Sequence, residues 1–197
     1  MYDKYKERQV FVKSLPFMQT AKALAKSKGM NDHGPLHAQR VHSIVGHLCT
    51  LIELSAHERD LVRAAALLHD IGMAGDRENH HIKSADIVRN LVAEGELPFN
   101  DQEAEIVSKL CEWHRREYKP DDVHQELKIR TGVLASLLRL ADAMDLDYRR
   151  GEDYPHQEPV IKQVYKEQSL HHLSVRNILG FRIRVVAVLS FIYSSIK

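Results

Sequence analysis

Cysteine is scarce in this sequence, which has only Cys49 and Cys111 among its 197 residues. The two cysteines match no CxxC spacing and cannot form a disulfide framework. Because both lie among apolar residues, we expect them to be buried thiols. So few cysteines suit a reducing compartment, and we therefore expect a cytoplasmic protein.

A strong net charge is also absent, because 28 Lys and Arg residues balance 27 Asp and Glu residues to give +1. No overall field therefore makes nucleic acid or an anionic membrane an obligatory partner, and we expect neither. The apolar run from Val185 to Tyr193 is too short for a membrane span, which needs about 20 residues. The N-terminus has mixed charge and no long apolar core, so we expect no signal peptide.

The composition is that of a folded domain, with 44% hydrophobic and 28% charged residues. Up to about residue 150 the apolar residues recur with a helical period, which predicts an all-α bundle of about six helices. The first helix is expected to be either continuous or broken near Pro16, and Asn100 with Glu103 resembles a capping box at the start of the fifth. The expected helices cover about 4–28, 33–54, 56–70, 80–94, 100–118 and 125–147.

The chain from residue 151 onward differs from this pattern. A loop or linker precedes "FRIRVVAVLSFIY", which is rich in β-branched and aromatic residues. Those residues suit either a strand pair or a last helix. We expect residues 1–150 to form the helical domain and 151–197 to pack against it or against a second subunit of a homodimer. An incomplete second domain is the alternative.

Six ionisable residues lie at the ends of faces that the helical period predicts to be buried. His37, for example, shares one face with Val41 and Ile44, and His69 with Asp70 ends the apolar stretch "RAAALLHDIGM". The six residues are His37, His69, Asp70, His80, His114 and Asp142.

Each of these residues also has an ordinary explanation. A single histidine on an apolar face is more often a hydrogen-bonded core residue than a ligand. A buried Asp142 needs a cation, and Arg139, three residues earlier, offers one. Convergence of the whole set on a metal centre would satisfy all of them together. Imidazole and carboxylate groups suit one or two ions of Mn, Fe, Co, Ni or Zn, and Mg is a less favoured candidate for this site.

The order of these residues resembles a known signature. His37 in "HAQRV", His69-Asp70 in "LLHDIG" and Asp142 in "LLRLADAMD" are similar to the H…HD…D pattern of the HD superfamily of metal-dependent phosphohydrolases. The resemblance covers about residues 31–150. "HHIKSADIV" and "CEWHRREY" further resemble the extra histidine motifs of two branches. These are the HD-GYP cyclic dinucleotide phosphodiesterases and the helical HD-like region of exopolyphosphatase and guanosine pentaphosphatase proteins.

The resemblance implies a catalytic centre. One ion would be held by His37, His69, Asp70 and Asp142, and Asp70 would bridge to a second ion. His80 and His114 would hold that second ion, with His81 as the alternative to His80. His69 and Asp70 are then the residues on which catalysis depends. A water activated by the metal would attack the phosphorus of a phosphomonoester or phosphodiester.

The resemblance also implies a small phosphorylated ligand, such as a nucleotide, whose charge nearby cations would neutralise. The candidate cations for this role are Lys83, Arg115, Arg116 and Arg149.

Other polar residues have secondary roles in this scheme. His33 is a further ligand, a substrate contact or a helix cap, and Asp145 is a hydrogen-bond partner of a ligand. Arg40 is a structural residue.

The chain departs from the best-known branches. Met73 stands where HD-GYP proteins have lysine, Trp113 replaces one histidine, and the GYP motif is absent, so cyclic di-GMP activity is not expected. The ATPase domains of exopolyphosphatases are also missing. Two further functions fit the same residues: a non-enzymatic HD-type sensor that binds a nucleotide, and a structural helical domain with ion-paired histidines.

Overall fold

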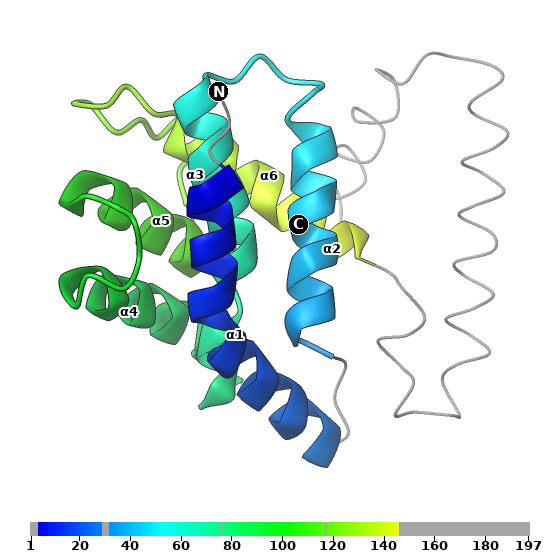
Figure 1. Cartoon of the computed structure of the whole chain (residues 1–197). Coiled ribbons are helices and arrows are strands. Elements are labelled where there is room, and N and C mark those ends of the chain that lie inside the picture. Colours follow the sequence, from blue (N-terminus) through cyan, green and yellow to red (C-terminus); the bar gives the residue numbers. More distant parts are fainter. Residues whose placement is uncertain (1–3, 29–31, 76, 117, 146–197) are drawn as a thin grey trace, which may run out of the picture. The chain divides into compact units, whose positions relative to one another are not determined.

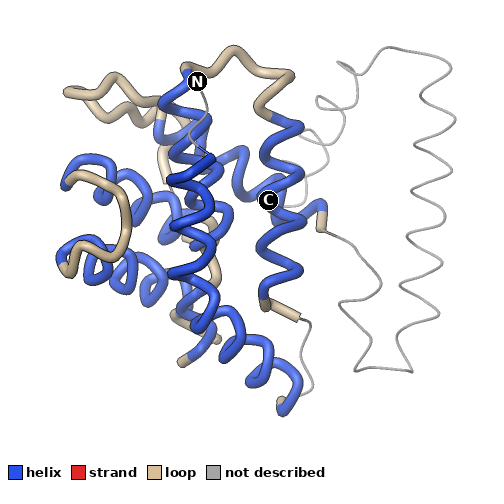
Figure 2. The backbone as a smooth tube through the Cα atoms, in the orientation of Figure 1, coloured by secondary structure: helices blue, strands red, loops and turns tan. Residues whose placement is uncertain are grey.

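Helices make up nearly all the regular structure of the part of the chain that the structure describes. The computed structural model describes residues 4–28, 32–75, 77–116 and 118–145. These residues contain six α-helices and one short 3-10 helix, arranged as in Figure 1. No strand is drawn for them in Figure 2, and the all-α class agrees with the sequence prediction. The elements are α1 (Lys4–Ser27), α2 (Pro35–Leu48), α3 (Ala56–Leu68), η1 (Ile71–Ala74), α4 (His80–Ala93), α5 (Asp101–Trp113) and α6 (Thr131–Met144).

The α3 helix is the centre of the described bundle. It contacts α1, α2, α5 and α6, and eight of its 13 residues are buried, so it can be surrounded on most sides. Its last turns consist of alanine and leucine, whose small and flexible side chains allow neighbouring helices to approach. The α4 and α5 helices pack closely against each other and lie side by side in Figure 1. The ends of these helices therefore meet near the C-terminus of α3.

Local sequence signals fix several helix ends. Asn100 and Glu103 form the predicted capping box of α5, and Ser55 with Glu58 forms another at α3. Pro35 occupies the first turn of α2, where its missing N–H costs nothing. The α1 helix continues through Pro16, so the break considered there does not occur.

Three predicted ends are wrong. The α2 helix ends at Leu48 rather than residue 54, because a tight turn follows in which Thr50 N–H and its hydroxyl both bond the carbonyl of His47. The α5 helix ends at Trp113 rather than residue 118. The α6 helix begins at Thr131 rather than residue 125, because Lys128 has a positive φ of 54°, which a right-handed helix cannot include.

Several predictions fall outside the described residues. They include the linker and apolar segment at 151–197 and the end of the sixth helix at 147. Among the helices that the structure describes, none is long and apolar enough to span a membrane.

An ion pair between the buried Glu58 and the partly exposed Arg130 joins the start of α3 to the start of α6. The Glu58 side chain is only 4% exposed and accepts Arg130 Nε and Nη2, each at 2.8 Å. Its carboxylate also accepts the backbone N–H groups of Ser55 at 2.8 Å and Arg130 at 3.1 Å. These hydrogen bonds, the one from the Arg130 side chain above all, lower the pKa of Glu58 to about 2. Glu58 therefore fixes where both helices begin.

Replacing Glu58 with Gln should lower the free energy of unfolding by about 1–3 kcal/mol, because the bidentate partner of Arg130 loses its charge. Urea denaturation followed by circular dichroism measures the change. Glu105→Gln is the control, because that side chain is 62% exposed and should change stability by less than about 0.5 kcal/mol.

The Glu58–Arg130 pair makes the stability of the fold depend on pH. The folded pKa of Glu58 is about 2 against an ordinary 4.5, so its contribution to stability is present above pH 4.5 and is lost as the pH falls toward 2. Glu58→Gln should lose less stability than the wild type across that window. Equal losses in the two proteins would contradict the role of this pair.

Candidate metal centre

The six residues at the ends of the predicted core faces come together at one place. They arrive from five helices and the link between α3 and η1. His37 lies on α2, His69 and Asp70 follow α3, His80 begins α4, His114 follows α5, and Asp142 lies on α6. All except Asp142 are buried, and the Asp142 side chain is 32% exposed. The structure thus brings residues separated by up to 105 positions in the chain into one cluster.

The first half-site consists of His37, His69, Asp142 and one oxygen of Asp70. His37 Nε2 lies 3.2 Å from His69 Nε2 and 3.4 Å from Asp142 Oδ1. Asp70 Oδ2 lies 3.3 Å from His37 Nε2 and 3.4 Å from His69 Nε2. Four ligand atoms therefore face one another across a space of atomic size.

The second half-site consists of His80, His114 and the other oxygen of Asp70. His80 Nε2 lies 3.1 Å from His114 Nε2. Asp70 Oδ1 lies 3.2 Å from His80 Nε2 and 3.4 Å from His114 Nε2. Asp70 is thus shared between the two half-sites, one oxygen to each.

These spacings fit metal ligands. Two donor atoms that each lie about 2.1 Å from one ion are separated by about 3.0 to 3.4 Å in octahedral or tetrahedral geometry. The seven ligand-atom distances above all lie in that range, whereas His69 Nε2 and Asp142 Oδ1 are 3.9 Å apart. Three groups within the cluster could each hold an ion: His37, His69 and Asp142; Asp70, His80 and His114; and His33, His37 and Asp70.

The Nδ1 atoms of three of the clustered histidines show why a cation is needed at Nε2. His69 Nδ1, His80 Nδ1 and His114 Nδ1 bond the carbonyls of Ala66, Arg77 and Cys111, at 2.9, 2.6 and 2.6 Å. A carbonyl only accepts, so each Nδ1 carries the proton and each neutral ring presents a lone pair at Nε2.

Facing lone pairs at 3.1–3.2 Å repel one another unless a proton or a metal ion lies between them. The donor set of the cluster therefore fits a divalent transition metal, the identity of which the residues leave open.

The carboxylates are held in their charged form. Burial would raise the pKa of Asp70, but His69, His114 and His33 lower it well below its usual range when the ring nitrogens that face it carry a proton. Burial likewise opposes ionisation of Asp142, yet His37 and His69 lower its pKa. Burial also lowers the pKa of His114. The pKa of His69 is raised, because the two carboxylates outweigh its burial.

A second layer orients His37. Its Nδ1 bonds Asp145 Oδ2 at 2.6 Å, and Asp145 is held in turn by Arg40, through Nε at 2.7 Å and Nη2 at 3.1 Å. A carboxylate behind a ligating histidine fixes its ring and raises its basicity. This contact agrees with the role expected for Asp145 and with a structural Arg40.

The alternative partner of Asp142 is not realised. Arg139 instead donates to the carbonyl of Arg116 at 3.2 Å and lies over the ring of Tyr118. Asp142 is therefore held by the histidines of the cluster rather than by an internal arginine.

His33 lies at the edge of the first half-site. Of its three expected roles, helix capping is wrong, because Gly34 is the N-cap of α2. Its Nδ1 lies 2.8 Å from Asp70 Oδ2 instead, and its side chain is 20% exposed. His33 therefore contacts the shared carboxylate from the solvent side.

His80, rather than His81, faces Asp70. The His81 ring lies 5.8 Å from that of His80 and 6.4 Å from that of His114, between centroids. Burial, then the charges of His80, Arg115 and Arg116, lower the pKa of His81. His81 thus borders the second half-site together with the cations of that region.

The candidate cations differ in their surroundings. Lys83 and Arg115 are exposed, and Arg116 pairs with Glu112 at 2.5 Å. Lys83 Nζ lies near Gly75. Arg149 lies outside the described residues.

Gly72 has a role that the sequence did not reveal. The sequence suggests a helix stop, but a Cβ atom there would lie 2.2 Å from the His80 carbonyl oxygen and 2.5 Å from Ser84 N. The Ser84 hydroxyl also accepts Gly72 N–H at 2.9 Å. Glycine therefore lets the start of α4 approach the shared Asp70. The small Ser84, four residues after His80, was the available signal.

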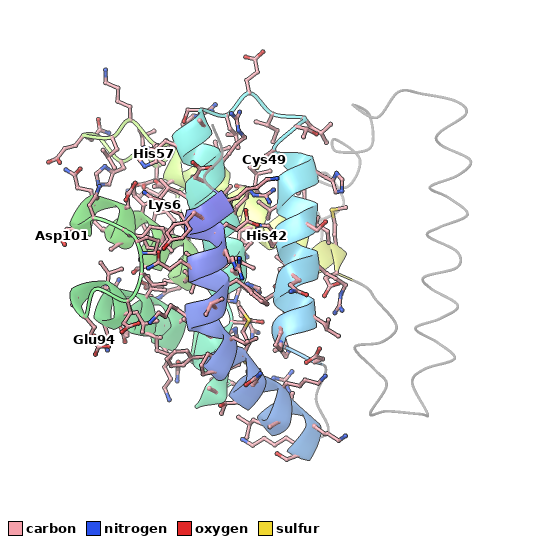
Figure 3. The ribbon with its side chains drawn as sticks, viewed as in Figure 1. Lys6, His42, Cys49, His57, Glu94 and Asp101 are labelled. Atoms are coloured by element: carbon pink, nitrogen blue, oxygen red, sulfur yellow. The ribbon has the colours of Figure 1, made fainter. Side chains whose placement is uncertain are left out.

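A cavity of about 270 Å³ lies elsewhere, between α1, α3 and the start of α5. Val10, Leu61 and Ala64 line it, with Lys6 and His57, labelled in Figure 3, among its polar residues. No residue of the metal cluster lines this cavity, and its walls include three carboxylates. The cavity is therefore separate from the metal cluster, and its carboxylates disfavour an anion there.

Comparison with known proteins gives one match. A family model described as HD-CE matches residues 27–188, which is most of the chain. No curated protein and no solved structure matches the sequence.

Replacing Gly72 with Ala should destabilise the protein by about 1–3 kcal/mol and weaken metal binding, because backbone atoms of α4 must move away. Thermal unfolding and titration with Mn²⁺ measure the two effects. Gly75→Ala is the control, because its nearest neighbour would be the flexible Lys83 Nζ at 3.6 Å. Equal stability of the two variants would show that Gly72 is not needed for this approach.

Replacing Asp145 with Asn should weaken Mn²⁺ binding by about 10- to 100-fold, because His37 loses its charged partner. Isothermal titration calorimetry measures the affinity. Asp86→Asn, at a side chain 60% exposed, should leave it unchanged. An Asp145→Asn affinity equal to that of the wild type would contradict the orienting role.

Proposed function

Because the chain belongs to the HD-CE family, we propose that it is a metal-dependent phosphohydrolase that cleaves a phosphomonoester or phosphodiester, with a nucleotide as the substrate class. The observation that carries this proposal is the sharing of Asp70 between two sets of histidine lone pairs. Paired ligand sets of this kind suit two-metal phosphate chemistry. The partner is then a small phosphorylated molecule in the cytoplasm, and a homodimer is the assembly we propose.

The residues of the cluster would hold Mn, Fe, Co, Ni or Zn. His37, His69, Asp142 and Asp70 would hold one ion, and His80, His114 and Asp70 the other. When bound, such ions supply Lewis acidity toward a phosphoryl oxygen and a nucleophilic water near neutral pH. Mg is less favoured, since it prefers oxygen ligands and several waters.

The protein's own groups prepare the site for an anion. Asp70 stays ionised because donors from both half-sites surround it. The partial exposure of Asp142 gives the substrate an approach to the first half-site. Arg115 is exposed and, within the described part of the chain, is engaged by no hydrogen bond or ion pair, so it is available to a phosphate oxygen. Lys83, Arg116 and Arg149 are the further cations that we assign to the substrate.

The test measures metal content and phosphate release. Purified protein should contain a transition metal by mass spectrometry. With Mn²⁺, Co²⁺ or Ni²⁺ it should release phosphate or alcohol from nucleotides or from bis-p-nitrophenyl phosphate. Asp70→Asn and His69→Ala should each lose about 100-fold or more in rate, since each removes a metal ligand. His47→Ala, at an exposed histidine of α2, should keep the wild-type rate.

Two results would count against the proposal. Nucleotide binding without turnover in any metal would favour the sensor function instead. A protein without bound metal, whose thermal stability is unchanged by chelator, would favour a structural role, because a metal that binds only the folded state stabilises it.

A further inference from the structure

The two half-sites offer unequal sets of ligands. The first has two histidines, a carboxylate of its own in Asp142, and Asp70 Oδ2. The second has two histidines, and among the described residues its only carboxylate oxygen is Asp70 Oδ1, which belongs to the shared residue. An ion at the second half-site would therefore have fewer protein ligands and less negative charge around it. Both differences lower the affinity for a divalent cation.

The groups behind the histidines add to this difference. In the first half-site, His37 is supported by the charged Asp145 at 2.6 Å. In the second, the Nδ1 atoms of His80 and His114 bond neutral peptide carbonyls, and no carboxylate of the described residues stands behind them. A carboxylate behind a histidine makes it a better metal ligand than a carbonyl does.

The surroundings of the second half-site are cationic. Arg115 follows His114 directly, and its charge, with that of Arg116, reaches the His81 ring beside the site. Arg116 is engaged by Glu112, whereas Arg115 is not paired within the described residues. This positive field opposes a second divalent ion and favours an anion.

We propose that the first half-site binds its ion tightly, and that the second half-site binds its ion weakly until a phosphate group completes it, with Arg115 contacting that phosphate. The second ion and the phosphate then bind cooperatively, and each raises the affinity of the other by the same factor. The inference rests on the metal centre of the proposed function. If the inference holds, occupation of both half-sites by metal ions depends on the substrate concentration as well as on the metal concentration.

Titration of the full chain with Mn²⁺, with and without inorganic phosphate, tests this inference by calorimetry. Without phosphate we expect two binding events that differ by at least about tenfold in affinity. With phosphate, the weaker event should strengthen by about fivefold or more, and the tighter one should not change. Electron paramagnetic resonance should show the spectrum of a coupled Mn²⁺ pair at lower Mn²⁺ when phosphate is present.

Variants assign each event. His80→Gln should remove the weaker event, and Asp142→Asn should weaken the tighter one. Arg115→Ala changes only an exposed side chain. It should leave the tighter event unchanged, strengthen the weaker event somewhat without phosphate because a repelling charge is removed, and abolish the effect of phosphate. Arg89→Ala, at an exposed arginine of α4 that pairs with Asp86, should keep that effect.

Several outcomes would overturn the inference: two events of equal affinity, a phosphate effect on both or neither, or a full phosphate effect in Arg115→Ala. Failure of the proposed function looks different. Unequal events with phosphate coupling but no hydrolysis of any substrate would support the inference and remove the hydrolase. Hydrolysis of a substrate together with two Mn²⁺-binding events of equal affinity would contradict this inference and leave the proposed function standing.

Discussion

The position of Asp70 is the constraint on which the rest of the structure depends. A buried carboxylate costs several kcal/mol unless it is compensated, and here its two oxygens are each surrounded by histidine nitrogens from different helices. Because these nitrogens are held as lone-pair donors, the cluster is stable only with protons or cations within it. The bundle is therefore organised around the place where α3 ends.

The helix ends suit this centre electrostatically. The α3 and α5 helices end at His69 and His114, and Asp142 lies in the last turn of α6, so three negative helix ends point toward a cation. The α4 helix begins at His80, and its positive end lies on the side where Arg115 stands. The same geometry thus favours metal ions in the cluster and an anion beside its second half-site. The Glu58–Arg130 pair fixes α3 and α6 at their opposite ends.

The sequence predicted the helices and the six clustered residues because both depend on local periodicity. Spacings of three and four placed His37 and Asp142 on core faces before any contact was known. Helix ends were harder to predict. The positive φ of Lys128 and the tight turn after Leu48 are backbone conformations that the spacing of apolar residues does not reveal. The partners of the histidine Nδ1 atoms and the close approach at Gly72 were likewise invisible, because they arise only when separate helices meet.

The most direct test is a crystal structure of the protein grown with Mn²⁺, with anomalous diffraction measured at the manganese edge. The account predicts anomalous peaks on the two sides of Asp70, one among His37, His69 and Asp142 and the other between His80 and His114. Absence of both peaks in a protein that keeps this arrangement of residues, or manganese bound only at surface carboxylates, would contradict it.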